Sequence, residues 1–442
     1  MDDHRPTREN SRRVLSTLLT ATVAAALSLA GLSPASAADG TPPVPFCPPG
    51  QQTIGTHVTE RLYDTEHGGG FTASITSGAL PAGAELVNAS WYADYAATPS
   101  AEGSYDFTVQ LTSTLGTTSQ ATCHVDVDDA VSLEGVTTTR IAGSDRYDVA
   151  ANISRYAFPT GPQVVYVASG EVFADAVSVS AIAAQRNASL LLTRAGSVPN
   201  VTLAELARLQ PHAIVIVGGT DTISSAVETE LAKFATTVKR VYGVDRYEVS
   251  RFLITDPSFG AQPSTKAYIA SGNVFPDALA AGPAAANLKA PVLLVDGAAA
   301  AMTVAEIDLL QSRGVTRTSL VGGPATISTS IEAQVGSTFA QAKRLTGADR
   351  FEVSAAVARD AFPVSGATRP DTVYLATGVS FPDALSGAVI AATTGSPIYL
   401  AHTDCIPQDV ARHIDDLGAS KVVLLGGTES LNSAVADLVV CT

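Results

Sequence analysis

The sequence is short of cations. It has 27 Lys and Arg residues against 42 Asp and Glu residues, which gives a formal net charge of −15 over 442 residues. Binding to nucleic acid or to anionic lipid depends on clustered Lys and Arg that neutralise phosphate charges, so this composition argues against both partners. We expect no nucleic-acid partner.

Motifs of catalysis and nucleotide binding are also missing. The repeated part of the chain has no Gly-rich dinucleotide fingerprint or P-loop, and no nucleophile elbow or His-Glu-x-x-His motif occurs. The seven His residues occupy no equivalent positions in the repeats, and no His cluster or Cys-x-x-Cys pair predicts a metal site. The sequence therefore predicts a binding protein without metal or cofactor, and not an enzyme. A carboxylate pair for glycoside cleavage leaves no such motif, so that alternative stays open.

Long apolar runs are confined to the N-terminus. Four Arg residues precede an apolar stretch over residues 14–32, which ends in Ala35-Ser36-Ala37, a pattern that signal peptidases accept. We predict a signal peptide over residues 1–37, and the alternative is a membrane anchor of about 19 residues. Removal of four Arg and three acidic residues changes the net charge from −15 to −16. The exported chain is expected to hold to a surface non-covalently, without a membrane span.

Residues 38–132 predict a small β domain. Tyr105, Phe107, Val109 and Leu111 alternate with polar residues, and the same alternation returns over 121–127 after a turn. This period of two indicates an antiparallel hairpin that faces a core. The Leu-Pro-x-Gly turn at 80–83, the Thr98-Pro99 turn and the following Gly-x-Tyr-x-Phe-x-Val run resemble the Ig-like domains of bacterial surface proteins. The resemblance implies a β-sandwich with an unknown ligand, which acts as a spacer or as an adhesive module.

From residue 138 the chain repeats itself about every 100 residues. The series Arg-x-x-Gly-x-Asp-Arg-(Tyr/Phe) begins at Arg140, Arg240 and Arg344. It is followed in each copy by (Ser/Thr)-Gly-x-x-Phe-(Pro/Ala)-Asp-Ala and by (Val/Leu)-Gly-Gly. Such repetition predicts three homologous domains, over 138–238, 239–342 and 343–442.

Each repeat alternates short apolar runs with helical patterns. In the first, we predict strands at 137–142, 164–168, 190–192 and 213–217, with helices from Asp145, Ala174, Val201 and Ser224. Uninterrupted apolar strands between helices indicate a parallel sheet that is buried on both faces. The predicted fold class is therefore α/β, with three tandem Rossmann-like three-layer modules after the β-sandwich.

The four Cys residues fit this division. Four allow three pairings in principle. Cys47 and Cys123 bracket the N-terminal domain, whereas Cys405 and Cys441 bracket the end of the last repeat. We predict the disulfides Cys47–Cys123 and Cys405–Cys441. The alternative of a zinc site lacks the usual ligand spacing.

Together the repeated motifs resemble the cell-wall-binding repeat type 2 family of Gram-positive bacteria. The resemblance covers residues 138–442 in the triple arrangement typical of that family. It implies a compact pseudo-trimer that attaches non-covalently to a wall polysaccharide or other secondary wall polymer, and a secreted, cell-surface location. Because the family also occurs fused to hydrolases, the alternative is a cell-wall amidase or glycosidase, or its modifier, that the repeats target to the wall.

Two sets of charged residues recur as candidates for polymer binding. Asp145, Asp245 and Asp349 open a helix and predict capping, while the Arg beside each pairs with a structural carboxylate or contacts polymer. A second Asp sits in the first turn of the next helix, where the helix dipole favours it and where open α/β sheets bind ligands. The candidates are Arg146, Arg246, Arg350, Asp175, Asp277 and Asp383.

Two further candidates rest on the resemblance. The family's Pro-Ile-Leu-Leu motif, which is linked to polymer binding, corresponds to segments that begin at Pro291 and Pro397, whereas repeat 1 has Ser189 at this position. The Gly-Gly pairs predict a tight turn or a phosphate cradle. We expect the Arg residues, rather than bridging cations, to overcome repulsion between an acidic protein and an anionic polymer.

Overall fold

The computed structural model describes residues 42, 44–54, 57–63, 71–89, 92–128, 131–172, 179–274, 276–365 and 369–441. It has two compact units, Met1–Ala130 and Val131–Thr442. The predicted signal peptide, 1–37, lies outside the described residues. No described helix is long and apolar enough to cross a membrane.

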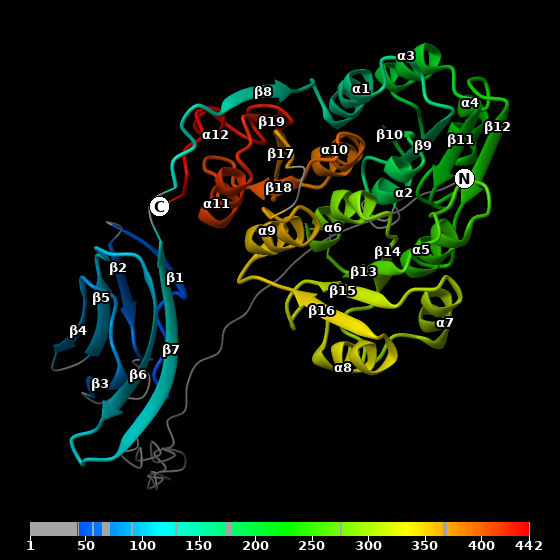
Figure 1. Ribbon diagram of the computed structural model, residues 1–442. Helices are drawn as coiled ribbons and strands as arrows, with labels where there is room; N and C mark the ends of the chain where they lie inside the picture. The colour runs from blue at the N-terminus through cyan, green and yellow to red at the C-terminus, as the bar shows by residue number, and fades with distance from the viewer. Residues whose placement is uncertain are drawn as a thin grey trace, which may run out of the picture. The chain divides into compact units, whose positions relative to one another are not determined.

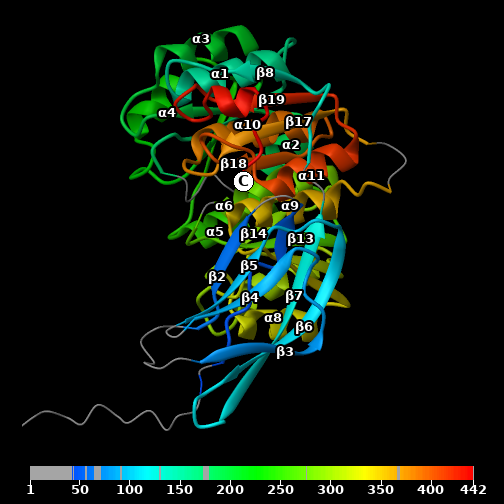
Figure 2. The same ribbon diagram turned by 90° about the vertical axis from the view of Figure 1, so that its left-hand side faces the viewer.

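The first unit is a β-sandwich (Figure 1, Figure 2). One sheet has the order β1(Gln51–Thr53), β7(Thr118–Asp128), β6(Gly103–Thr112), β3(Thr72–Gly78), and the other has the order β2(Val58–Arg61), β5(Tyr92–Ala97), β4(Ala84–Ala89). The predicted hairpin is formed by β6 and β7, which pair antiparallel. Its alternation is confirmed, because Phe107, Val109, Leu111, Cys123 and Val125 are buried in the core of this unit. The predicted Cys47–Cys123 disulfide is confirmed, with its sulfur atoms 2.03 Å apart.

The second unit alternates strands and helices as predicted. The first repeat holds β8(Thr137–Ile141), α1(Arg146–Ala157), β9(Val164–Ser169), α2(Val179–Gln185), β10(Ser189–Thr193), α3(Asn200–Leu209), β11(Ala213–Val217) and α4(Ser225–Leu231). The predicted start of the second helix, at Ala174, falls outside the described residues. β9, β10 and β11 are almost wholly buried, as their unbroken apolar sequence predicts.

The other two repeats have the same order of elements. The second holds β12(Thr237–Val241), α5(Arg246–Thr255), β13(Lys266–Ser271), α6(Pro276–Asn287), β14(Val292–Val295), α7(Val304–Ser312), β15(Arg317–Val321) and α8(Thr329–Thr338). The third holds β16(Gln341–Leu345), α9(Arg350–Ala361), β17(Thr372–Thr377), α10(Pro382–Thr393), β18(Ile398–Ala401), α11(Gln408–Leu417), β19(Lys421–Leu425) and α12(Ser433–Ala436). The predicted Cys405–Cys441 disulfide closes the end of this repeat.

The three parallel sheets do not coincide with the three sequence repeats. Their strand orders are β10-β9-β11-β12, β14-β13-β15-β16 and β18-β17-β19-β8. The first strand of each repeat thus completes a sheet built by another repeat. β12 joins the sheet of repeat 1, β16 joins that of repeat 2, and β8 joins that of repeat 3. Each four-stranded sheet is therefore shared between two of the predicted repeats, 138–238, 239–342 and 343–442 (Figure 1).

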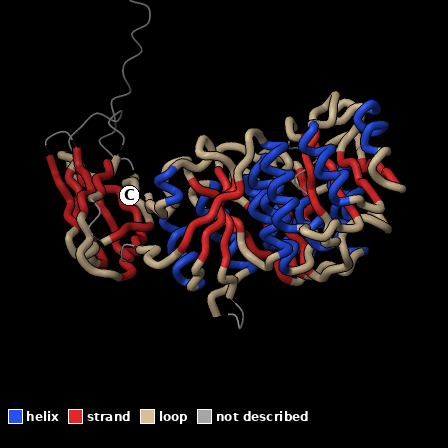
Figure 3. Tube along the Cα trace, turned by 90° about the horizontal axis from the view of Figure 1, so that it is seen from above, coloured by secondary structure: helices blue, strands red, loops and turns tan. Residues whose placement is uncertain are grey.

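Three helices pack against one another at the centre of the second unit. They are α2, α6 and α10, one from each repeat, and Figure 3 shows helices gathered between the strands. A methyl group on Gly282 of α6 would lie 2.5 Å from the hydroxyl oxygen of Ser180 and 3.4 Å from the methyl carbon of Ala388. Small residues at corresponding positions therefore let the helices meet closely, which gives the predicted pseudo-trimer.

Candidate functional site

A pocket of about 620 Å³ lies between repeats 2 and 3, at the carboxyl ends of the parallel strands. Repeat 2 contributes the loop after β13, the first turn of α6 with Asp277, and the Gly-Gly turn after β15 with Gly323. Repeat 3 contributes residues 346–350, which follow the exchanged strand β16. The strand exchange thus brings together three recurring motifs that are far apart in the sequence. Parallel α/β sheets bind ligands at this edge.

Asp277 is a buried carboxyl group in the wall of this pocket. Its residue is 6% exposed, and it forms a hydrogen bond with the hydroxyl of Thr326. Burial raises the pKa of Asp277 to about 6, while the hydroxyl of Thr326 and the charge of Arg350 oppose this rise. Gly322 has φ +110°, and a methyl group there would lie 2.3 Å from Asp277 Oδ2. The first Gly of the pair is therefore required both by the turn and by the carboxylate packed on it.

Asp383 has the same surroundings in repeat 3. It is 7% exposed, and Ser430 donates a hydrogen bond of 3.2 Å from Oγ to Asp383 Oδ2. Burial raises the pKa of Asp383, and Ser430 and Arg146 oppose the rise. Arg146 belongs to repeat 1, just as Arg350 of repeat 3 acts on Asp277 of repeat 2. The predicted Arg and Asp candidates therefore meet across repeats, not within one. The remaining Asp, Asp175, lies outside the described residues.

The three Arg candidates also order a loop of their own repeat. Arg146, Arg246 and Arg350 donate from Nη1 to the carbonyl oxygens of Gly170, Gly272 and Gly378, at 2.5, 2.6 and 2.7 Å. These Gly residues follow the second strand of each repeat. Arg146 and Arg350 have further N–H groups that this contact does not use. These two side chains therefore both support the rim and present donors near it.

The Asp residue directly before each of these three Arg residues is a helix cap, as predicted. Asp145, Asp245 and Asp349 accept hydrogen bonds from backbone N–H groups of the first turns of α1, α5 and α9. Capping of this kind stabilises a helix by about 1 kcal/mol. Their recurrence is therefore explained by local structure.

No role was predicted from the sequence for two other recurring groups. Arg140, Arg240 and Arg344 lie on the exchanged strands and donate from Nη1 to the carbonyl oxygens of Gly426, Gly218 and Gly322, at 2.9, 2.9 and 2.7 Å. They fasten each exchanged strand to the Gly-Gly turn of the neighbouring repeat. A hydroxyl also recurs three residues after each pair, as Thr222, Thr326 and Ser430. Recurrence at the repeat spacing was the available signal for both groups.

The structure does not bring Pro291 and Pro397 to this pocket. Both are buried and directly precede β14 and β18, so they lie at the amino ends of the strands. Their carbonyl oxygens accept hydrogen bonds from the backbone N–H groups of Tyr268 and Tyr374. We leave these two residues out of the proposed site.

A pH titration tests the burial of Asp277. A carboxyl group with a raised pKa in the folded state binds its proton more tightly there than in the unfolded chain. It therefore favours folding below about pH 4, and this contribution is lost as the pH rises towards 6. We expect the free energy of unfolding of the wild type, minus that of Asp277→Asn, to fall by up to about 3 kcal/mol over this range. Urea denaturation at a series of pH values measures it, and parallel pH curves for the two proteins would contradict the assignment.

Metal coordination has no support in the part of the chain that the structure describes. The described residues include no group of three or more His, Cys, Asp or Glu that could bind a metal ion. The pocket offers instead a guanidinium, a buried carboxyl group with a raised pKa, and exposed apolar surface at Val274. These groups suit reversible binding of a hydroxyl-rich ligand with occasional charges.

Comparison with known proteins identifies the family to which this chain belongs. The family model Cell wall binding domain 2 (CWB2) matches residues 140–228, 240–332 and 344–436, and the chain belongs to this family. Its repeats are binding modules, and membership indicates a secreted, cell-surface protein.

Two curated relatives from Bacillus subtilis share the repeated part. N-acetylmuramoyl-L-alanine amidase LytC is 28% identical over 298 residues, which are 67% of this chain and 57% of the relative. The Amidase enhancer is 28% identical over 301 residues, which are 68% of this chain and 40% of the relative. The chain therefore spans only about half of the length of these relatives.

Solved structures confirm the fold. Cwp6 from Clostridium difficile has a TM-score of 0.61 at 20% identity, covering 88% of this chain and 67% of that chain. Cwp8 from the same organism has a TM-score of 0.59 at 21% identity, covering 83% and 62%.

Proposed function

We propose that this protein attaches non-covalently to the bacterial cell wall by binding a secondary wall polymer in the pockets between its repeats. The observation that carries the proposal is the meeting of Asp277 and Arg350, which come from different repeats, in one pocket at the ligand-binding edge of a parallel sheet. Asp383 and Arg146 repeat the arrangement. The β-sandwich is the unit that such attachment displays, and the chain itself is not an enzyme.

Arg donors, rather than bridging cations, hold the polymer in this proposal. Ca²⁺ and Mg²⁺ need several oxygen ligands, whereas Asp277 and Asp383 are buried and already hydrogen-bonded to hydroxyl groups. Equivalent sites on one chain multiply weak affinities into firm attachment. Rising monovalent salt should weaken attachment, because exposed charge contacts are screened.

A second candidate is the targeting of a lytic activity to the wall. It is favoured by the names of the two curated relatives, an amidase and an amidase enhancer. Under this second candidate function the repeats bind the wall in the same way, and the chain modifies a hydrolase or brings it to the wall. A soluble-substrate assay for amidase and glycosidase activity of the purified chain separates the two candidates.

Sedimentation with purified wall sacculi tests the proposal. The wild type should bind native sacculi and fail to bind sacculi from which acid has removed the secondary polymers. The double variant Arg146→Gln/Arg350→Gln should bind native sacculi about 100-fold more weakly, because it loses charge-assisted contacts at two sites. EDTA at fixed ionic strength should leave the wild type bound.

The matched control is Lys233→Gln/Lys421→Gln, which removes two cations outside the inter-repeat pockets and should bind as the wild type does. Equal binding by the Arg double variant and the wild type would refute the proposed site. Clean release by EDTA, restored by Ca²⁺, would refute the Arg mechanism.

A further inference from the structure

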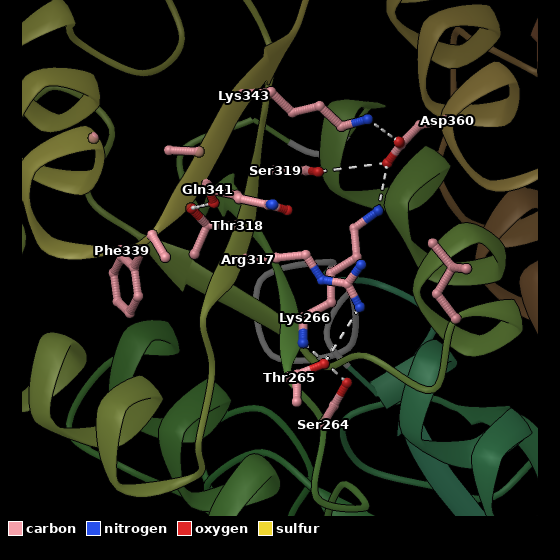
Figure 4. A pocket seen from close by; sticks show the side chains of 14 residues that line it. Ser264, Thr265, Lys266, Arg317, Thr318, Ser319, Phe339, Gln341, Lys343 and Asp360 are labelled. Carbon is pink, nitrogen blue, oxygen red and sulfur yellow. Dashed lines mark hydrogen bonds and ion pairs between the residues drawn. The ribbon is translucent and has the colours of Figure 1, made fainter.

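A second pocket, of about 820 Å³, lies at the opposite edge of the repeat 2 sheet (Figure 4). It is lined by the first residues of three neighbouring strands, β13, β15 and β16, and by Asp360 of α9. The inter-repeat pocket, by contrast, is lined by residues that follow the ends of these strands. The two pockets are therefore separate.

Three cations gather on one face of this sheet. Lys266 begins β13 and pairs with Arg317, which begins β15. Lys343 lies on β16 opposite Ser319, two residues after the pair of Arg317 and Gln341. Because side chains two residues apart in a strand share a face, Lys266, Arg317 and Lys343 all point to the side of the sheet that carries Asp360. Figure 4 shows them around the same cavity.

The carboxylate in the pocket balances only part of this charge. Asp360 is paired with both lysines, at 2.9 Å from Lys266 Nζ, and it accepts a hydrogen bond of 2.7 Å from the hydroxyl of Tyr268. Burial opposes ionisation of Asp360, but its hydrogen bonds to Lys343, Lys266 and Tyr268 win and lower its pKa. Arg317 forms no ion pair with any described carboxylate. The pocket therefore carries about two positive charges in excess.

Like charges at neighbouring positions of a sheet repel one another, so the excess charge is a cost to the fold. The pocket wall supplies further hydrogen-bonding groups from Ser264, Thr265 and Gln341 around an apolar floor at Phe339. Arg317 Nη2 donates to Thr265 Oγ1 at 3.4 Å, which is long for a hydrogen bond. Most N–H donors of Arg317 are therefore left for another partner. Forked N–H donors of this kind match the oxygens of phosphate and carboxylate.

The corresponding positions of the other two sheets lack this charge. In the repeat 1 sheet, strand pairing places Val164, Ala213 and Lys239 where Lys266, Arg317 and Lys343 stand. In the repeat 3 sheet the residues are Thr372, Lys421 and Thr139. Each of these sheets holds one cation at this edge, so three cations are not a requirement of the fold.

We propose that this pocket is a single-copy binding site for an oxyanion, the phosphate or carboxylate group of an extended anionic chain or of a small free anion. An incoming anion would offset the excess charge of Lys266, Arg317 and Lys343 and accept hydrogen bonds from Arg317 and the wall hydroxyls. The site does not depend on the inter-repeat pockets, and it gives an acidic protein one local point of attraction for an anionic ligand.

Calorimetric titration of the full mature chain tests this site with three probes: inorganic phosphate, a poly(glycerol phosphate) oligomer and an oligogalacturonate. Arg317→Gln should weaken binding of the preferred probe about tenfold, because a hydrogen-bonded charge contact is lost. Arg317→Glu should abolish binding, and Arg317→Lys should retain most of it. Arg317 is exposed and bears no ion pair to a described carboxylate, so these variants are expected to fold.

Lys421→Gln is the matched control, because Lys421 occupies the position of Arg317 in the repeat 3 sheet; it should bind as the wild type does. Tighter binding of either polymer than of inorganic phosphate assigns the site to an extended chain, and equal binding assigns it to a free anion. Absence of binding by all three probes, or equal losses in Arg317→Gln and Lys421→Gln, would overturn the proposal. Arg146→Gln/Arg350→Gln should bind these probes normally, so failure of the wall-binding proposal would not affect this result.

Discussion

A chain that starts at residue 143, and so lacks β8, is expected to lose about 4 kcal/mol of stability in the repeat unit. β8 is the fourth strand of the repeat 3 sheet and pairs with β19 over five residues. Arg140 adds hydrogen bonds to the carbonyl oxygens of Gly426 and Gly427, and Thr138 bonds to that of Ala436. Removal would leave the edge of β19 unpaired in a buried sheet. Urea denaturation followed by circular dichroism measures the change.

The matched control for this truncation is the chain that starts at residue 131, which lacks the β-sandwich but keeps β8. Because the two units have separate hydrophobic cores, this chain should unfold at the same urea concentration as the repeat unit of the full protein. Equal midpoints for the chains that start at 131 and 143 would show that β8 contributes nothing to the repeat 3 sheet.

Gly426→Ala is expected to destabilise the repeat unit by about 3–5 kcal/mol. Gly426 has φ +103°, a conformation that residues with a Cβ rarely adopt, and its new methyl group would lie 2.3 Å from Asp383 Oδ2 and 3.2 Å from Ser430 Cβ. The substitution therefore strains the backbone and also displaces a buried, hydrogen-bonded carboxyl group. Thermal or urea denaturation should show a transition at a lower temperature or urea concentration than in the wild type, and wall binding should fall with it.

The adjacent Gly427 provides the control. A methyl group there would meet no atom within 4 Å, and its φ lies outside the strained positive range. Gly427→Ala should therefore change stability by less than about 1 kcal/mol. Comparable losses of stability in Gly426→Ala and Gly427→Ala would mean that the turn itself requires both glycines. The packing of Asp383 on Gly426 would then not be the reason that glycine is needed.

Features that depend on neighbouring residues were predictable from the sequence. The alternation from Phe107 to Leu111 gave the hairpin of the sandwich, and unbroken apolar runs gave the buried strands β9 and β11. Asp145 was predicted to cap α1 because a short acidic side chain before a helix accepts its first N–H groups. Asp277 was predicted at the carboxyl end of a strand, and the structure places it there.

Features that depend on distant pairing were not predictable. β8 and β19 are nearly 300 residues apart, and an apolar pattern shows that a strand is buried without showing which sheet receives it. The cross-repeat meeting of Arg350 with Asp277 follows from the exchange of β16 and was missed for the same reason. Pro291 recurs in a family motif, but recurrence alone does not distinguish a buried strand start from a ligand contact.

The pairing of β8 with β19 also fixes how many junctions the repeats form. An open array of repeats has one fewer junction than it has repeats, and its two ends need capping. Here the first strand of the array returns to the last sheet, so three repeats form three junctions and no terminal repeat is left over. A fourth copy could be added only by breaking this closure. The number of junctions is therefore set by geometry at three, and substitutions can alter the individual junctions but not their number.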